Sequence, residues 1–365
     1  MKRTLKINAA VILAVVVLMV LGTIMIYSAS AVKAGRDFGD GGFFFKRQAL
    51  FGVAALSVMI AMSLIPYGAW ERLAAPLIIL TIVLLAAVLS PLGHTSNNAT
   101  RWFRIGPVSL QVAEFAKLVV VIYLARYLGR RSEEVGSDSR ILIRPLVLLV
   151  TVVVLVACEP DLGTAIFIGL LGCGMFFVAG APLRSLAGLA IASSPLIAFL
   201  ILKQEFRVQR IQAFLNPWKE YEGSGFQLVQ SFLAFGDGGV FGTGLGGGKS
   251  KLLFLPESHT DFILAVVGEE LGFVGVAVVI GLYGVIVTKG IQIARRAPDS
   301  FGMLTAAGVT LMIGLQALIN AMVVLGLLPT KGLPLPFFSY GGSSLLTSAA
   351  AAGILMSVST RGSEP

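Results

Sequence analysis

Long apolar runs separated by short polar connections dominate the pattern of the chain. The runs are continuous rather than alternating, so they do not fit strands whose two faces differ. About 20 apolar residues in a helix cross the hydrocarbon core of a bilayer, where backbone polar groups must be hydrogen-bonded internally. We expect an all-α integral membrane protein, a single polytopic membrane domain over residues 1–365 with about ten transmembrane helices. The runs cover residues 7–28, 47–65, 73–92, 111–128, 143–158, 163–180, 184–202, 261–288, 301–326 and 343–359.

Basic residues in the connections predict which side of the membrane each connection faces. An even number of spans places both termini on one side, and cytoplasmic loops carry an excess of Lys and Arg. The first run is longer than the apolar core of a signal peptide, so we interpret it as an uncleaved span. We therefore expect both termini in the cytoplasm, on the face that carries Lys2, Arg3, Lys6, Arg72, Arg130, Arg131, Arg140, Arg184, Lys289, Arg295 and Arg296. The opposite face also holds cations: Lys33, Arg36, Lys46, Arg47, Arg101, Arg104 and Lys331.

The longest connection, residues 203–260 between spans seven and eight, is expected outside. It contains FRVQRIQAFLNP and FQLVQSFLAFG, which predict two short amphipathic helices at the membrane interface. Arg207 and Arg210 are three residues apart, so they share one helical face. The segments GTGLGG at 242–247 and GGGKS at 246–250 resemble phosphate-binding loops. Neither has the spacing and the strand-to-helix context of such a loop, so we interpret both as glycine turns.

Composition excludes a soluble protein. Hydrophobic residues make up 56% of the chain and charged residues 13%, against about 25% charged residues in soluble domains. The mean hydropathy is +0.89. The net charge of +9 would suggest nucleic-acid binding in a soluble protein, but here it fits the charge bias of membrane proteins, and we expect no nucleic-acid partner. The two cysteines, Cys158 and Cys173, define neither a disulfide framework nor a metal site.

Charged residues in or beside apolar spans are costly, which makes them functional candidates. In LPESHTDFILAVVGEELG, Asp261 stands where a polar segment becomes apolar, and Glu269 and Glu270 lie inside the apolar run. Asp261 and Glu269 are expected to line one cavity, whereas Glu270 points away and is interpreted as structural. The other such residues are Glu114 and Lys117, three apart on one face of the fourth span, and Glu159 and Asp161 in CEPDLGT.

These residues suit an outward-facing site for an anionic lipid. Arg and Lys bind the oxygens of a pyrophosphate through charge-assisted hydrogen bonds, and a carboxylate beside it accepts a proton from a hydroxyl nucleophile. The pattern predicts glycosyl or phosphoryl transfer on a lipid carrier. Structural roles stay open: mutual neutralisation for Glu114 and Lys117, helix capping for Asp161 and Asp261, interface anchoring for Arg101 and Arg104, and an interfacial position for His259. No cofactor is defined, although Asp161, Asp261 and Glu114 could hold a divalent cation such as Mg²⁺ or Mn²⁺.

Four segments resemble the SEDS family of shape, elongation, division and sporulation proteins. They are TRWFRIGPVSLQVAEFAKL, EPDLGTA, FLPESHTDFILAVVGEELGFVG and GLLPTKGLPLPFFSYGGSSLL. The resemblance covers nearly the whole chain. Within the family, PTKGLPLPFFSYGGSS is most similar to the division branch, with the rod-elongation and sporulation branches as alternatives. The chain departs from the family in Gln111-Val112-Ala113-Glu114, where Q-P-S-E is usual, and in Glu159, where Gln is usual.

The resemblance implies a peptidoglycan glycosyltransferase of the bacterial inner membrane that polymerises lipid II on the outer face of that membrane. Its implied partners are a class B penicillin-binding transpeptidase and other membrane proteins of the divisome or elongasome. The family's essential loop carboxylate falls on Asp261, its cavity lysine on Lys117, its cavity acid on Asp161 and its basic outer loop on Arg101 and Arg104. We expect the substrate site to be completed by Glu114, Arg207, Arg210, His259 and Lys331.

Two other functions compete with this reading. A lipid II flippase would place its central charges near the middle of the membrane, whereas these charges are expected at the outer end. A non-catalytic scaffold for a transpeptidase would need no charged cavity. Asp261 is the expected general base, and His259, two residues earlier, is its rival because an imidazole titrates near neutral pH.

Overall fold

The computed structural model describes residues 2–96, 99–106, 108–136, 138–249 and 258–361. Ser250 of the glycine-rich segment, and Leu255, Pro256 and Glu257 of the segment before Asp261, lie outside the described residues. Each of the ten predicted spans coincides with a helix. These helices are α1 (Lys2–Phe38), α2 (Phe43–Leu64), α3 (Tyr67–Val88), α4 (Val112–Gly129), α5 (Ile143–Cys158), α6 (Leu162–Val178), α7 (Leu183–Leu202), α10 (Ile263–Ala294), α11 (Ser300–Val324) and α12 (Gly342–Arg361).

Length and composition fit a protein that crosses the membrane several times. Within the described residues, eight helices are long and apolar enough to span a bilayer: α1, α2, α3, α5, α7, α10, α11 and α12. Helix α6 is apolar but only 17 residues long. Helix α4 has 18 residues and carries Glu114, Lys117 and Arg126 among them.

Three smaller helices complete the helical part. The two amphipathic segments predicted between spans seven and eight form α8 (Glu205–Leu215) and α9 (Phe226–Gly238). A short 3₁₀ helix, η1 (Ser139–Leu142), precedes α5.

A small sheet corrects the purely helical expectation. Strands β1 (His94–Ser96), β2 (Ala99–Ile105) and β3 (Val108–Gln111) form an antiparallel sheet in the order β1-β2-β3 between α3 and α4. Trp102 pairs with both His94 and Gln111. Gly106 turns the chain between β2 and β3 with φ of 60°, in the left-handed region that glycine adopts without steric cost. TRWFRIG lies in strand β2 and the turn that follows it. It does not cross lipid, so it need not be helical.

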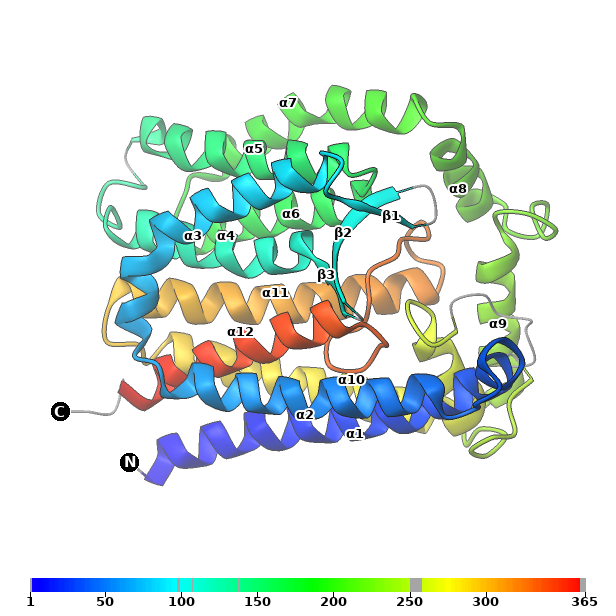
Figure 1. The fold of residues 1–365 in the computed structure, drawn as a ribbon. Helices are drawn as coiled ribbons and strands as arrows, with labels where there is room; N and C mark the ends of the chain where they lie inside the picture. Colours follow the sequence, from blue (N-terminus) through cyan, green and yellow to red (C-terminus); the bar gives the residue numbers. More distant parts are fainter. Residues whose placement is uncertain (1, 97–98, 107, 137, 250–257, 362–365) are drawn as a thin grey trace.

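Figure 1 shows both termini at one end of the bundle, and the sheet, α8 and α9 at the other. The core is centred on α11 and α12, whose membrane-length windows are mostly buried, whereas no residue of α7 is buried. The connection between α11 and α12 returns into the end remote from the termini. This end therefore collects the polar connections that the sequence places outside the membrane.

Helix α10 is interrupted at Gly272, whose φ of 68° and ψ of −167° are not helical. The connection after α9 replaces the lost helical hydrogen bonds. Thr243 and Gly244 donate backbone N–H groups to the carbonyls of Glu269 and Glu270 at 2.9 and 3.0 Å. The amides of Phe273 and Val274 donate to the carbonyls of Gly239 and Val240 at 2.9 and 3.2 Å. The glycine turns of this segment, with positive φ at Gly242, Gly244 and Gly246, thus place backbone amides against the carbonyls of α10.

Candidate active site

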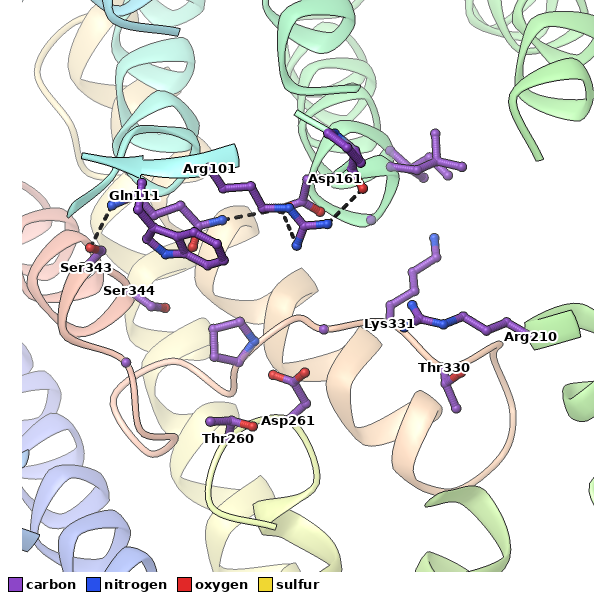
Figure 2. A pocket seen from close by; sticks show the side chains of 18 of the residues that line it. Arg101, Gln111, Asp161, Arg210, Thr260, Asp261, Thr330, Lys331, Ser343 and Ser344 are labelled. Carbon is purple, nitrogen blue, oxygen red and sulfur yellow. Dashed lines mark hydrogen bonds and ion pairs between the residues drawn. The ribbon is translucent and has the colours of Figure 1, made fainter. Parts of the chain in front are cut away.

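A cavity of about 1050 Å³ lies at the end of the bundle remote from the termini. Its walls come from the β2–β3 ribbon, the start of α6, helix α8, the turn before α10 and the α11–α12 connection (Figure 2). Five cationic side chains and two carboxylates line it, among apolar side chains such as Phe51, Ile201 and Leu328. The charged and hydroxyl- or amide-bearing lining residues are Arg47, Arg101, Ser109, Gln111, Asp161, Arg207, Arg210, Thr260, Asp261, Thr330, Lys331, Tyr340, Ser343 and Ser344.

Asp261 lies in the turn before α10, and its carboxylate points into the cavity in Figure 2. Three consecutive backbone carbonyls hold this turn. The carbonyl of His259 accepts from the Tyr340 amide at 3.0 Å, and that of Thr260 accepts from the Ser339 hydroxyl at 2.6 Å. The carbonyl of Asp261 accepts from Asn320 Nδ2 at 2.8 Å. The backbone of the acid is therefore fixed by α11 and by the connection that follows it.

The α11–α12 connection forms the wall beside Asp261. Asn320 also donates to the carbonyl of Leu333 at 2.8 Å, so one amide joins this wall to the turn that carries the acid. Gly332 lies so close that a Cβ atom on it would stand 2.9 Å from Asp261 Oδ2. This proline-rich segment shapes the cavity, since the lining residues include Pro329, Lys331 and Pro334.

Arg101 and Asp161 join the ribbon to the start of α6. Arg101 donates from Nε to the carbonyl of Glu159 at 3.1 Å and from Nη2 to that of Pro160 at 2.8 Å, and its Nη1 lies 3.9 Å from Asp161 Oδ2. Asp161 caps α6 by accepting from the Thr164 amide at 3.1 Å and hydroxyl at 2.9 Å. The capping role of Asp161 is thus present together with its position in the cavity.

The cations of the cavity are partly desolvated and lie close to one another. Burial lowers the pKa of Lys331, and Asp161 opposes this shift. Burial and then Arg101 lower the pKa of Arg210, while Asp261 and Asp161 raise it. Burial, Arg101 and Arg210 likewise lower the pKa of Arg207. Each lowered pKa means that burial raises the free energy of the positively charged form. An anion bound between these groups would offset that increase.

Glu159 is buried beside this wall, at the end of α5. Both of its carboxylate oxygens lack a hydrogen-bond partner among the described residues. Burial raises its pKa to about 8, the nearby Asp161 adds to the shift, and Arg101 opposes it. The residue is therefore mostly protonated at neutral pH. Glu159 therefore adds little negative charge at a position where the family usually has an uncharged Gln.

Glu114 and Lys117 do not line the cavity. Their side chains are 4% and 2% exposed and form an ion pair at 2.8 Å. Lys117 Nζ also donates to Gln316 Oε1 at 2.8 Å and lies 5.3 Å from the ring centre of Phe167. The geometry favours the mutual neutralisation that the sequence left open, and gives no support to the predicted contact of either residue with substrate.

Arg104 and His259 also lie outside the cavity lining. Arg101 and Arg104 are in a strand, where side chains three apart point to opposite faces, so only Arg101 faces the cavity and Arg104 is exposed. His259 is 5% exposed and packs beside the rings of Phe44 and Tyr340 at centroid distances of 4.7 and 5.7 Å. Asp261 is thus better placed than His259 to act as a base.

The two acids of α10 have structural contacts. Glu269 was expected to share a cavity with Asp261, but it does not line this one, and its carboxylate accepts from the Lys249 amide at 2.5 Å. Glu270 accepts from the Ser28 hydroxyl at 2.7 Å, as fits its expected structural role. Within the described part of the chain there is no group of three His, Cys, Asp or Glu residues that could hold a metal ion. Asp161 and Asp261 line the cavity without Glu114, so the three suggested Mg²⁺ ligands are not assembled.

Sequence reasoning missed several lining residues because they are ordinary polar residues. Gln111 Nε2 donates to Asp161 Oδ2 at 3.3 Å, and the Gln111 amide donates to the Ser343 hydroxyl at 3.0 Å. Arg47 was noted only as an outward cation, although it lines the cavity. The serines of SYGGSS at the start of α12 are the one signal that could have indicated this wall, because small polar residues at a helix start suit a site.

Comparison with known proteins identifies relatives over nearly the full length. The model of the cell cycle protein family FtsW/RodA/SpoVE matches residues 8–364. The "Probable peptidoglycan glycosyltransferase FtsW" of Geobacter metallireducens is 41% identical over 99% of this chain and 96% of its own. The stage V sporulation protein E of Bacillus subtilis is 39% identical over 98% of both chains. A solved chain described under "Structural coordination of polymerization and crosslinking by a peptidoglycan synthase complex" aligns with a TM-score of 0.81 and 29% identity, over 97% of this chain and 98% of its own.

Proposed function

Because the chain belongs to the FtsW/RodA/SpoVE family of cell cycle proteins, we propose that it is a multi-pass membrane peptidoglycan glycosyltransferase. It polymerises lipid II into glycan strands on the outer face of the bacterial inner membrane. Its place is in cell division, as for the FtsW relatives. The similar identity to a sporulation protein keeps the sporulation branch, together with rod elongation, as the alternative setting of the same reaction.

The observation that carries this proposal is one carboxylate facing a group of cations across a cavity with apolar walls. Asp261 stands on one side, and Arg101, Arg210 and Lys331 stand on the other (Figure 2). A lipid II molecule joins water-soluble sugars to a pyrophosphate and a polyprenyl tail, so the bond that reacts lies at the membrane surface. The cavity offers matching chemistry for each part.

In the proposed reaction, the acceptor sugar's 4-hydroxyl oxygen attacks the anomeric carbon of the donor sugar. A new carbon–oxygen bond forms, and the bond between the anomeric carbon and the pyrophosphate oxygen breaks. Asp261 takes the proton of the hydroxyl, while undecaprenyl pyrophosphate leaves with its charge offset by Arg101, Arg210 and Lys331. Arg207, on the same face of α8 as Arg210, adds to the field on the leaving group.

The position of the charges also bears on the two rival functions. The segments that carry Asp261 and the cations of the cavity meet at the end of the bundle remote from the termini, which favours surface chemistry over transport through the middle of the membrane. A scaffold alone would give no reason for five cations lining one cavity with a fixed acid. We propose a class B penicillin-binding transpeptidase as the partner that crosslinks the product, with both termini of this chain in the cytoplasm.

The test is polymerisation of lipid II by the purified full-length chain together with its transpeptidase. Asp261→Asn preserves the shape of the side chain and removes the base, so we expect a loss of about 10²–10⁴-fold in rate with lipid II binding retained. Asp237→Asn is the matched control, because Asp237 is an exposed acid of α9 paired with Lys249 at 3.6 Å. His259→Gln should lose much less activity per folded molecule. Normal polymerisation by Asp261→Asn would place the base elsewhere.

A further inference from the structure

A second, smaller cavity lies at the other end of the molecule. It has a volume of about 230 Å³ and is formed by α3, the last turns of α4 and the residues just after α4. The α4–α5 connection lies at the same end of the bundle as both termini (Figure 1). Its lining residues are Ala75, Tyr123, Arg126, Tyr127, Arg130 and Arg131. Neither the glycosyltransferase chemistry nor the family's site residues account for this arrangement.

Helical spacing gathers these side chains. Residues 123, 126, 127 and 130 are separated by three or four positions, so they share one face of α4 and its end. Tyr127 is fixed, because its hydroxyl donates to the carbonyl of Ile141 at 3.1 Å and the Arg131 guanidinium lies 4.3 Å from the centre of its ring. The rings of Tyr123 and Tyr127 stack at 6.3 Å. The cavity therefore has a rigid aromatic wall with cations on it.

Two polar groups of the cavity have no protein partner among the described residues. Arg130 is satisfied by Glu71, at 2.8 Å from Nη2. Within the described residues, the Tyr123 hydroxyl and the Arg126 guanidinium have no hydrogen-bond or ion-pair partner, and both line the cavity. Three arginines stand against one carboxylate there; Glu133 and Glu134 follow in the chain but do not line the cavity. A cation at the end of α4 also favours the helix dipole, but that effect explains neither the cavity nor the tyrosines.

We propose that this cavity binds the phosphate headgroup of an anionic phospholipid from the cytoplasmic leaflet. A guanidinium binds two phosphate oxygens at once, and tyrosine hydroxyls lie at headgroup depth in membrane proteins. Basic pockets between helices on the cytoplasmic side are suited to such lipids. Arg126 and Arg131 hold the phosphate, Tyr123 donates its hydroxyl to it, and Arg130 with Glu71 closes the α3 side.

The experiment measures the unfolding midpoint of the purified full-length chain in a neutral detergent as phosphatidylglycerol is added. Phosphatidylcholine, which has a phosphate but no net charge, and inorganic phosphate are added in parallel. We expect phosphatidylglycerol alone to raise the midpoint in a saturable way. In the double variant Arg126→Gln/Arg131→Gln we expect the apparent affinity for this lipid to fall by about 25-fold, roughly fivefold for each arginine. The matched control, Arg295→Gln/Arg296→Gln, changes two arginines at the end of α10 and should leave the affinity unchanged.

Three results would overturn the proposal. Equal affinity in the wild-type chain and the Arg126/Arg131 variant would remove the cavity as the site. Equal loss in the Arg295/Arg296 control would show only a general attraction between the basic face and anionic lipid. Equal stabilisation by inorganic phosphate would identify a soluble anion as the ligand. Should the double variant not fold, Tyr123→Phe, which removes one hydroxyl, is expected to weaken phosphatidylglycerol binding by about fivefold, and an unchanged affinity there also overturns the proposal.

Discussion

Two pairs of a carboxylate and a cation have different roles in this structure. Glu114 and Lys117 are sealed inside the bundle at 2.8 Å, whereas Asp161 and Arg101 stand 3.9 Å apart on the cavity wall with 11% and 27% of their side chains exposed. The first pair has no route to substrate in this arrangement, and the second has one. The comparison teaches that a charged residue near a span is an important residue. Only the surroundings of its side chain show whether it has a structural or a catalytic role.

The largest expected effect comes from breaking the buried pair. Lys117→Ala would leave the Glu114 carboxylate buried without its cation, which typically costs about 3–5 kcal/mol. We expect a large fall in the unfolding midpoint of the purified chain and little folded protein in the membrane. The double variant Lys117→Met/Glu114→Gln removes both charges and should recover most of the stability. A Lys117→Ala chain that folds normally but fails to polymerise lipid II would instead return Lys117 to the substrate site.

The cavity can be altered by a substitution that leaves the buried pair of Glu114 and Lys117 unchanged. Gly332→Ala adds a Cβ atom that would stand 2.9 Å from Asp261 Oδ2, so the carboxylate must move by several tenths of an ångström. A displacement of about 1 Å in a catalytic group can cost about 10²-fold, so we expect kcat to fall by about tenfold with an unchanged unfolding midpoint. Gly163→Ala is the control, since its added Cβ atom would be no closer than 3.6 Å to Asp161 Oδ1. Equal activity in the two variants would contradict the close contact.

Glu159 provides a pH test beside the exposed pair. Its pKa is about 8 in the folded chain against an ordinary 4.5, so the folded state keeps a proton that the unfolded state has lost. The resulting stability is complete below about pH 4.5 and is lost as pH rises through about 8. Between about pH 7 and 8 the folding equilibrium constant should fall about fivefold. Glu159→Gln should remove this dependence and be more stable than the wild-type chain at pH 9, whereas the exposed Glu133→Gln should leave it unchanged.

The smallest effect is expected from removing only the charge of Asp161. Asp161→Ala removes the cap of α6 and should cost about 0.5–2 kcal/mol, while Asp161→Asn keeps a capping oxygen and loses only the charge. Because a partly exposed pair at 3.9 Å is worth about 0–1 kcal/mol, the Asn variant should unfold close to the wild-type midpoint. Chemical denaturation of the two variants side by side measures the difference. An Asn variant as unstable as the Ala variant would mean that the ion pair with Arg101, rather than the cap, holds this wall.

The apolar pattern predicted most of the fold, because every segment that crosses lipid must be apolar and must satisfy its backbone hydrogen bonds internally. All ten predicted runs are helices, and the two predicted amphipathic segments outside them form α8 and α9. The bounds differ where helices extend past the apolar part. The first run, 7–28, belongs to a helix from Lys2 to Phe38. The sheet was missed because its strands are only 3, 7 and 4 residues long, too short for an alternating pattern to stand out beside a span.

The site was predictable in kind more than in detail. Asp261, Asp161, Arg101, Arg207, Arg210 and Lys331 all line the cavity, because polar residues at the ends of neighbouring spans remote from the termini converge there. Sequence could not separate Lys117 from these cations, since one helix position differs from the next only in which neighbour it faces. Arg104 was misplaced because the sequence grouped it with Arg101 as one basic loop, whereas the segment is a strand and side chains three apart in a strand point to opposite faces. Asn320 carries no charge, so nothing marked it as the residue that fixes the backbone of Asp261.

The interruption of α10 has a consequence for how this chain can vary. The connection after α9 meets the break mainly through backbone groups, with Thr243 and Gly244 on one side of Gly272 and Gly239 and Val240 on the other. The Thr243 hydroxyl adds one side-chain bond, to the carbonyl of Glu269 at 3.1 Å. Outside Thr243 and the close-packed glycines, the identity of the side chains matters little there, whereas the number of residues matters greatly. One residue deleted between 239 and 244 would leave two amides or two carbonyls facing nothing. Among related chains, the segment that corresponds to residues 239–244 should therefore vary in amino-acid sequence but keep its length.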